Sequence, residues 1–186
     1  MKSKKGYFFL IDAFIGSAII ILSLVIILNS DVTTAKFQQD YTITEDYATF
    51  LINTHIQDIN NEYIRNLTLS GLITNPQYSI MEQIDQFYYN ARYICNAGDA
   101  SCIAANLSYA NKMLQNITDP LIKQKYSFSL FIKDTAKKIN QSIYERNMSN
   151  ISTASFVLSS RKITFLQINS SAMFGPQIVE IKVWLP

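Results

Sequence analysis

A nearly unbroken apolar segment at the start of the chain constrains its fold more than any other feature. Three lysines precede residues 7–28, which are almost entirely apolar and contain one acid, Asp12. As a helix, this segment extends about 33 Å, close to the roughly 30 Å thickness of a bilayer core. We therefore expect a transmembrane helix over residues 7–29, with the lysine-bearing N-terminus in the cytoplasm and the rest of the chain outside.

Asp12 is the unusual residue of this segment. A charge inside a membrane segment is costly, so its presence suggests that it serves a purpose. The plain alternative is that Asp12 lies near the cytoplasmic interface and reaches water there.

Residues 30–186 are expected to form one extracytoplasmic head domain. They are numerous enough for one hydrophobic core, and the scarcity of Gly and Pro is typical of a folded rather than a disordered segment. The net charge of the chain is only +2, which gives no electrostatic reason to expect a nucleic acid partner.

Hydrophobic spacing predicts helices in the first half of this head. Residues 32–67 contain no Pro or Gly and carry apolar side chains at helical spacing, so we expect the first helix to continue and to end near residue 70. Two shorter helices are predicted over about 78–95 and 100–118, the second ending at Asp119-Pro120. Together they form a predicted helical hairpin over residues 78–118.

In the second half of the head, apolar residues recur at every second position instead of at helical spacing. Alternating apolar residues predict a strand at 126–132, a weaker one at 139–146, a long one at 153–168 and a last one at 179–185, with a turn at Gly175-Pro176. In the last strand, Glu180, Lys182 and Trp184 lie on one face. Helices followed by strands predict an α+β fold with an antiparallel sheet of three to four strands over residues 124–186.

Cys95 and Cys102 are the only cysteines of the chain. In an exported domain, the natural interpretation is a disulfide that closes a short loop between the two hairpin helices. Two free thiols remain an alternative. A metal site is disfavoured because the only histidine, His55, is remote in sequence and no C-x-x-C occurs.

Seven sequences fit the N-x-[ST] glycosylation acceptor, where about two or three are expected by chance. This excess predicts a glycosylated surface, although an Asn-rich composition is the alternative source of such sequences. The acceptor residues are Asn66, Asn106, Asn116, Asn140, Asn147, Asn150 and Asn169.

No catalytic or cofactor-binding motif occurs in the sequence. There is no G-x-S-x-G, no phosphate-binding glycine loop and no HExxH. His55 lies on a predicted helix in a polar context that is typical of a solvated face. We therefore expect a structural protein without a cofactor rather than an enzyme.

The N-terminus resembles the class III signal peptide of type IV pilin-like proteins, in its archaeal form. The resemblance rests on Lys4-Lys5-Gly6, the apolar residues 7–11 and the acid Asp12. It implies that a prepilin-type signal peptidase of the membrane removes residues 1–6 by cutting between Gly6 and Tyr7. The best-known bacterial pattern has a Glu at the fifth mature position, whereas here the acid is at the sixth. Residues 175–186 also look similar to the last strand of archaeal pilin-like surface proteins.

This resemblance implies a structural subunit, minor or accessory rather than major, of an archaeal type IV filament or cell-surface assembly. Its partners would be other pilin-like subunits, with residues 7–29 forming the filament core. Asp12 would then pair with the new amino group at Tyr7 of a neighbouring subunit and fix its register in an apolar core.

Other functions remain open at this point. The chain is alternatively an uncleaved single-pass surface glycoprotein that binds a partner through its head. Thr33-Thr34-Ala35 offers a conventional cleavage site that would release a soluble secreted domain. An extracytoplasmic enzyme would have to depend on His55.

Overall fold

The computed structural model describes the backbone of residues 4–147 and 150–185, and the side chains of residues 13–26, 42–147 and 150–185. The chain divides into two units, Met1–Ile43 and Thr44–Pro186. Helix α1 (Lys4–Asn53) provides the described backbone of the first unit and the opening residues of the second.

The expected transmembrane helix is not borne out. Among the residues whose side chains the structure describes, no helix is both long and apolar enough to cross a bilayer. The prediction of a transmembrane helix over residues 7–29 is therefore wrong, and so is the single-pass membrane localisation that followed from it.

The first helix also ends earlier than predicted. α1 stops at Asn53, a 3₁₀ turn follows at Ile56–Asp58, and a separate helix, α2, covers Glu62–Leu69. The break is stabilised by hydrogen bonds to a distant segment: the amide of Ile56 donates to the carbonyl of Tyr78 (2.9 Å), and the amide of Ile80 donates to the carbonyl of Thr54 (3.0 Å). The prediction of one helix ending near residue 70 is wrong because these bonds are not local.

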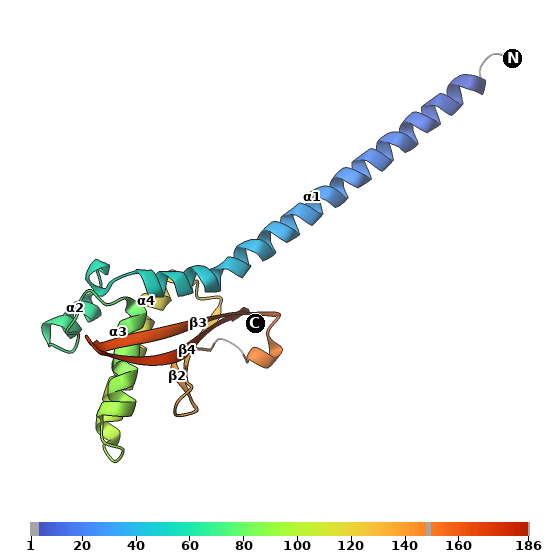
Figure 1. Ribbon diagram of the computed structural model, residues 1–186. Helices are drawn as coiled ribbons and strands as arrows, with labels where there is room; N and C mark the ends of the chain where they lie inside the picture. Colours follow the sequence, from blue (N-terminus) through green and yellow to red (C-terminus); the bar gives the residue numbers. More distant parts are fainter. Residues whose placement is uncertain (1–3, 148–149, 186) are drawn as a thin grey trace. The chain divides into compact units, whose positions relative to one another are not determined.

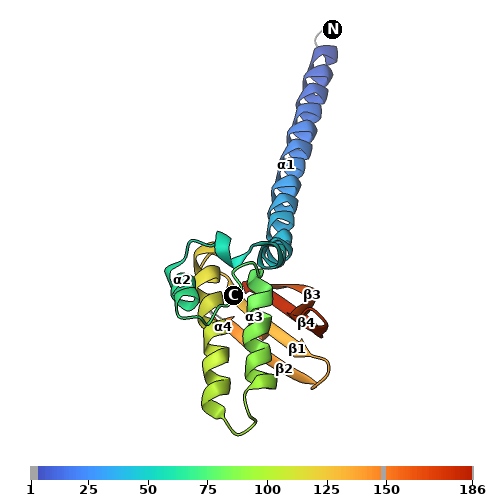
Figure 2. The same cartoon turned by 60° about the vertical axis from the view of Figure 1, so that its left-hand side comes forward.

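Two helices follow and lie side by side (Figure 2). α3 (Ile80–Tyr89) begins with a capping box in which Ser79 and Glu82 each bond the other's backbone amide, and it continues into a π-helical turn, η2 (Asn90–Ile94). α4 (Ala100–Leu121) begins at Asp99, whose side chain accepts a hydrogen bond from the amide of Cys102. These bonds satisfy amides that the first turn of a helix leaves free.

α4 ends at Leu121, just beyond Pro120, which was predicted to stop it. The guanidinium of Arg146 donates to the carbonyls of Ile122 (3.0 Å) and Lys123 (3.2 Å) and to the carboxylate of Asp119 (2.9 Å). Arg146 therefore ties the C-terminal end of α4 to the sheet.

The sheet has four antiparallel strands in the order β2-β1-β4-β3. Strands β3 (Phe156–Asn169) and β4 (Ala172–Leu185) form the long orange-to-red hairpin in Figure 1. Strands β1 (Ser127–Asp134) and β2 (Ile139–Arg146) form the shorter hairpin. The chain from Thr44 onward is therefore α+β, with its sheet at the C-terminal end.

Gly175-Pro176 lies inside β4 and does not form the predicted turn, which instead occurs between Asn169 and Ala172. Gly175 has a φ of 132°, and a side chain there would come within 2.9 Å of the carbonyl oxygen of Thr164 on β3. The glycine therefore fits a point where the pairing of β3 with β4 shifts its register.

The core lies between the helices and one face of the sheet. The end of α1 contributes Tyr47, whose ring meets that of Phe128 edge-on at 5.3 Å and whose hydroxyl lies 2.6 Å from that of Thr118. Leu51, Ile84, Leu114 and Leu130 are fully buried in the same layer.

Candidate functional site

Residues 13–26 of α1 form the most exposed apolar segment among the described residues. All of them are exposed, including Phe14, Ile20 and Leu22, which are 65–75% exposed. The two serines do not leave free hydroxyls, because Ser17 donates to the carbonyl of Phe14 (2.9 Å) and Ser23 to that of Ile19 (2.8 Å). This segment therefore presents an apolar surface on all sides, and such a helix is normally covered by other protein or by lipid.

The residues expected to direct processing and assembly precede this segment. Gly6, Tyr7 and Asp12 lie within the helical backbone of α1, and their side chains fall outside the described residues. The cleavage between Gly6 and Tyr7 and the pairing of Asp12 therefore stay predictions.

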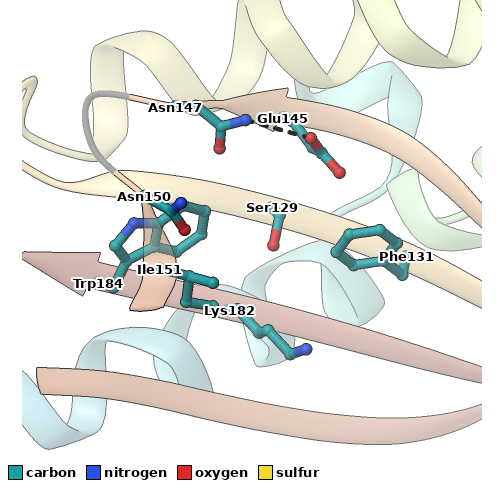
Figure 3. A pocket seen from close by; sticks show the side chains of 8 residues that line it. All are labelled: Ser129, Phe131, Glu145, Asn147, Asn150, Ile151, Lys182 and Trp184. Atoms are coloured by element: carbon teal, nitrogen blue, oxygen red, sulfur yellow. Dashed lines mark hydrogen bonds between the residues drawn. The ribbon is translucent and has the colours of Figure 1, made fainter. Parts of the chain in front are cut away.

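A groove of about 540 Å³ lies on the face of the sheet opposite the helices (Figure 3). Its floor consists of Ser129 and Phe131 from β1 with Lys182 and Trp184 from β4. Glu145 of β2 and three residues that follow this strand complete it: Asn147, Asn150 and Ile151. The groove thus combines aromatic, amide and charged side chains on one sheet surface.

Glu180 supplies the strongest electrostatic feature of this sheet face. Its side chain is 3% exposed and is paired with Lys133 (2.5 Å) and with Arg161 (2.7 Å), while Lys182 lies at 3.8 Å. Burial alone would raise the pKa of this carboxyl, but its bonds to Lys133 and Arg161 and the nearby Lys182 outweigh burial and lower the pKa to about 2. Glu180 is thus a negative charge that pairs with Lys133 and Arg161 on the two neighbouring strands and lies near Lys182 on its own strand.

A second buried carboxylate, Asp134, is the last residue of β1. It accepts hydrogen bonds from the hydroxyls of Tyr93 (2.6 Å) and Tyr88 (3.3 Å) and from the amides of Ala136 and Lys137 (both 2.9 Å). Burial alone would raise the pKa of Asp134, but these hydrogen bonds lower it. Because all its bonds are internal, Asp134 connects the β1–β2 hairpin to α3 and η2 rather than facing a ligand.

Cys95 and Cys102 form a disulfide, as the sequence predicted. The bond joins the end of η2 to the first turn of α4, and their Cα atoms lie 5.8 Å apart. Asn106, one helical turn further on, donates from its amide to the carbonyl of Cys102 (3.0 Å). The disulfide therefore joins the two hairpin helices at their connection.

The predicted glycan acceptors differ in their accessibility. Asn106 is half-buried and engaged beside the disulfide, whereas Asn116 is exposed but its acceptor sequence includes Thr118, which is fully buried against Tyr47. The other acceptors are exposed: Asn66, Asn140, Asn147, Asn150 and Asn169.

His55 was predicted to lie on a helix, and this is wrong. It follows the end of α1 and pairs with Ser79 in an isolated antiparallel bridge. Its Nδ1 atom lies 3.6 Å from the carboxylate of Asp58, at the surface. Within the described ranges, no three His, Cys, Asp or Glu side chains are grouped so that they would hold a metal ion.

Sequence reasoning placed Glu180, Lys182 and Trp184 on one strand face, and they do share the face opposite the helices. It did not identify the ion-pair cluster, because Lys133 and Arg161 reach Glu180 only through the pairing of three strands. It also missed the buried residue Asp85, whose neighbours Ile84 and Tyr88 marked this helix face as apolar.

No protein-family model, no curated protein and no solved structure matches the chain.

Proposed function

We propose that this chain is a pilin-like structural subunit of an archaeal type IV filament or related cell-surface assembly. The observation that carries the proposal is the exposed apolar helix at residues 13–26, whose serine hydroxyls are already bonded within the helix. Such a surface packs well against further copies of itself, because burial of its apolar side chains is favourable and leaves no side-chain polar group unpaired. The N-terminal resemblance to class III signal peptides supports the same function.

Small residues support close packing of these helices. Gly16, Ser17 and Ala18 are three consecutive small residues of this helix, and a Cβ atom added at Gly16 would meet nothing within 4 Å. A neighbouring helix therefore has room to approach the backbone at this point. Larger residues on both sides, such as Phe14 and Ile20, would then pack around the contact.

Processing would couple to assembly through Asp12. In the proposal, a prepilin-type signal peptidase cuts between Gly6 and Tyr7, and the new amine of one subunit pairs with Asp12 of its neighbour. A buried charge pair of this kind stabilises one register over others, because a shifted register leaves both charges unpaired.

The head, Thr44–Pro186, would be carried on the surface of the assembly. Its six exposed acceptor asparagines and the groove on its sheet support an accessory subunit rather than a closely packed major one. Glycopeptide mapping of native protein would test the glycan proposal: we expect occupancy at Asn66, Asn140, Asn147, Asn150 and Asn169, and least at Asn116, because Thr118 of its acceptor sequence is buried. A mass equal to that of the bare polypeptide would contradict it.

Two measurements test the assembly proposal. N-terminal mass spectrometry of native protein should find Tyr7 as the first residue, and a chain that begins at Met1 would contradict processing. For assembly, Ile19→Cys is informative, because both natural cysteines are already in the disulfide. We expect mild oxidation to cross-link this variant into covalent oligomers.

The matched control is Gln115→Cys on the exposed surface of α4. It should remain monomeric in denaturing electrophoresis under the same oxidation. Equal cross-linking of both variants, or of neither, would contradict helix packing through residues 13–26.

A further inference from the structure

A second pocket, of about 260 Å³, lies in the head on the helix side of the sheet, near where α1 ends and α3 begins. Its lining combines four apolar residues, Ile52, Met81, Ile163 and Phe165, with five polar or charged ones, His55, Ser79, Glu82, Asp85 and Thr164. Ligand pockets for larger molecules are typically about 300–1,000 Å³, so this one fits a small molecule or a single side chain.

The carboxylate of Asp85 lines this pocket and has no hydrogen-bond partner among the described residues. Asp85 is 0% exposed, and neither Oδ1 nor Oδ2 is paired. Thr164 of β3 lines the same pocket, and its buried hydroxyl is also unpaired. The hydroxyl lies close enough to favour the charged form of Asp85, yet the two groups do not complete a hydrogen bond of normal geometry. Two carboxylate oxygens and one hydroxyl therefore border the pocket without a hydrogen bond of normal geometry among the described residues.

The charges around the pocket favour a cation. Glu82 of α3 faces it while accepting a hydrogen bond from the amide of Ser79, and His55 borders it from the segment after α1. β3 contributes no charged side chain to the lining, and none of the described lining residues is Lys or Arg. Burial, with a smaller contribution from Glu82, raises the pKa of Asp85 to about 7, because the surrounding residues compensate the charge of this carboxylate poorly.

We propose that this pocket binds a primary ammonium group carried on an aliphatic chain, either as a free amine or as a lysine side chain of another protein. An ammonium has three N–H donors, which match the two oxygens of Asp85 and the hydroxyl of Thr164. The aliphatic chain would lie along the apolar walls. This inference goes beyond the proposed filament function and does not depend on it.

Other cations fit less well. A guanidinium has five donors in a fixed plane and would leave two or more unpaired, while a quaternary ammonium has none to offer Asp85. A calcium ion requires about six to eight oxygen ligands, and a single carboxylate with one hydroxyl supplies few of them.

The binding experiment uses the full chain in a buffer free of primary amines and of phosphate, with calorimetry and thermal unfolding as readouts. n-Butylammonium should bind and raise the unfolding temperature as its concentration rises. Butanol and tetramethylammonium should have no such effect, since the first lacks the charge and the second lacks N–H donors. Nα-acetyl-lysine methylamide tests whether a lysine side chain in a peptide enters as well as the free amine.

Variants connect the binding to the named atoms. Asp85→Asn should weaken n-butylammonium binding by at least about 30-fold, the loss typical of removing one member of a buried charge pair. Thr164→Val should weaken it by about tenfold, because one hydrogen bond to a charged group is lost. Asp46→Asn, at an exposed position of α1, is the control and should bind as the unchanged chain does.

Binding should also weaken by about tenfold between pH 8 and pH 6, because Asp85 must lose its proton to pair with the amine. The amine itself stays protonated over this range.

Equal binding by Asp85→Asn and the unchanged chain would overturn the proposal. So would equal responses to n-butylammonium and tetramethylammonium, or stabilisation by calcium chloride in place of the amine.

Discussion

At the scale of single residues, two buried carboxylates show how surroundings decide the effect of a charge. Glu180 is compensated by Lys133 and Arg161, so the folded head favours its charged form. Asp85 has no such partner among the described residues, so the folded head favours its protonated form. The two residues must therefore change the stability of the head in opposite directions as the pH changes.

Asp85 should make the head less stable as the pH rises. Its pKa is about 7 in the folded head and about 3.8 ordinarily, so its contribution is most favourable below pH 4 and is lost as the pH rises through 7. Asp85→Asn removes the titrating carboxyl group and with it this loss of stability at high pH. We expect it to increase the free energy of unfolding at pH 8 by about 2–4 kcal/mol, since each pKa unit corresponds to about 1.4 kcal/mol. Urea unfolding at pH 5 and pH 8 measures this, with Asp46→Asn as a control that should show no gain.

Glu180 should have the reverse dependence. Its pKa is lowered to about 2 from 4.5, so its contribution is complete above about pH 4.5 and is lost as the pH falls through 2. Glu180→Gln leaves Lys133, Arg161 and Lys182 without their shared carboxylate. We expect a loss of about 2 kcal/mol at pH 7, below the usual loss for a buried pair because the cations remain partly exposed.

Urea unfolding between pH 7 and pH 2 tests this, and the difference between variant and unchanged chain should shrink toward pH 2. Glu145→Gln lies on the same sheet face but is exposed, so it should change stability by less than about 0.5 kcal/mol. A loss at Glu145 as large as that at Glu180 would contradict the assigned role of the ion pairs.

At the scale of elements, the sequence predicted the helices and strands whose signals lie within their own residues. The alternation of apolar and polar residues indicated β4. Helices α3 and α4 each begin directly after the residue whose side chain caps them, Ser79 and Asp99. The break after Asn53 was missed because hydrogen bonds to Tyr78 and Ile80 stabilise it, far along the chain. One local signal did exist: Asn61 caps α2 by accepting bonds from the amides of the next turn.

The disulfide is the element-scale feature that is simplest to test. Cys95 and Cys102 are seven positions apart, and a loop this short is expected to contribute about 2–3 kcal/mol by restricting the unfolded chain. The double variant Cys95→Ser, Cys102→Ser should lose that amount in urea unfolding. Hydrogen exchange should rise first at η2 and the start of α4, which the bond joins. A reducing agent should reproduce the loss in the unchanged chain and have no effect on the double variant.

At the scale of the whole molecule, the order of helices and strands could be predicted, but the pockets could not. The groove requires the strand order β2-β1-β4-β3, which brings Glu145 and Lys182 onto one surface. The Asp85 pocket requires the end of α1, the start of α3 and the middle of β3 to meet. Hydrophobic periodicity does not predict such contacts, because they join residues far apart in the sequence: Glu145 and Lys182 are 37 positions apart, and Asp85 and Thr164 are 79.

The exposed segment of α1 and the stability of the head should be separable by mutation. Ile19→Lys with Leu22→Lys places two charges on side chains that are 61% and 67% exposed and have no role in the core of the head. If this segment packs against other copies, the buried charges would be unpaired and assembly should be abolished. Negative-stain electron microscopy and sedimentation measure assembly, and urea unfolding of the head should stay within about 0.5 kcal/mol of the unchanged chain.

The matched control uses two exposed apolar side chains of the head, Leu69 and Leu121, which are 78% and 55% exposed. Leu69→Lys with Leu121→Lys adds the same charge without touching residues 13–26, so this variant should still assemble. Loss of assembly in both variants would mean that added charge, rather than its position, prevents association. Retention in both would mean that the exposed segment of α1 does not form the core of an assembly. Only a loss confined to the Ile19 and Leu22 variant assigns the assembly surface to this helix.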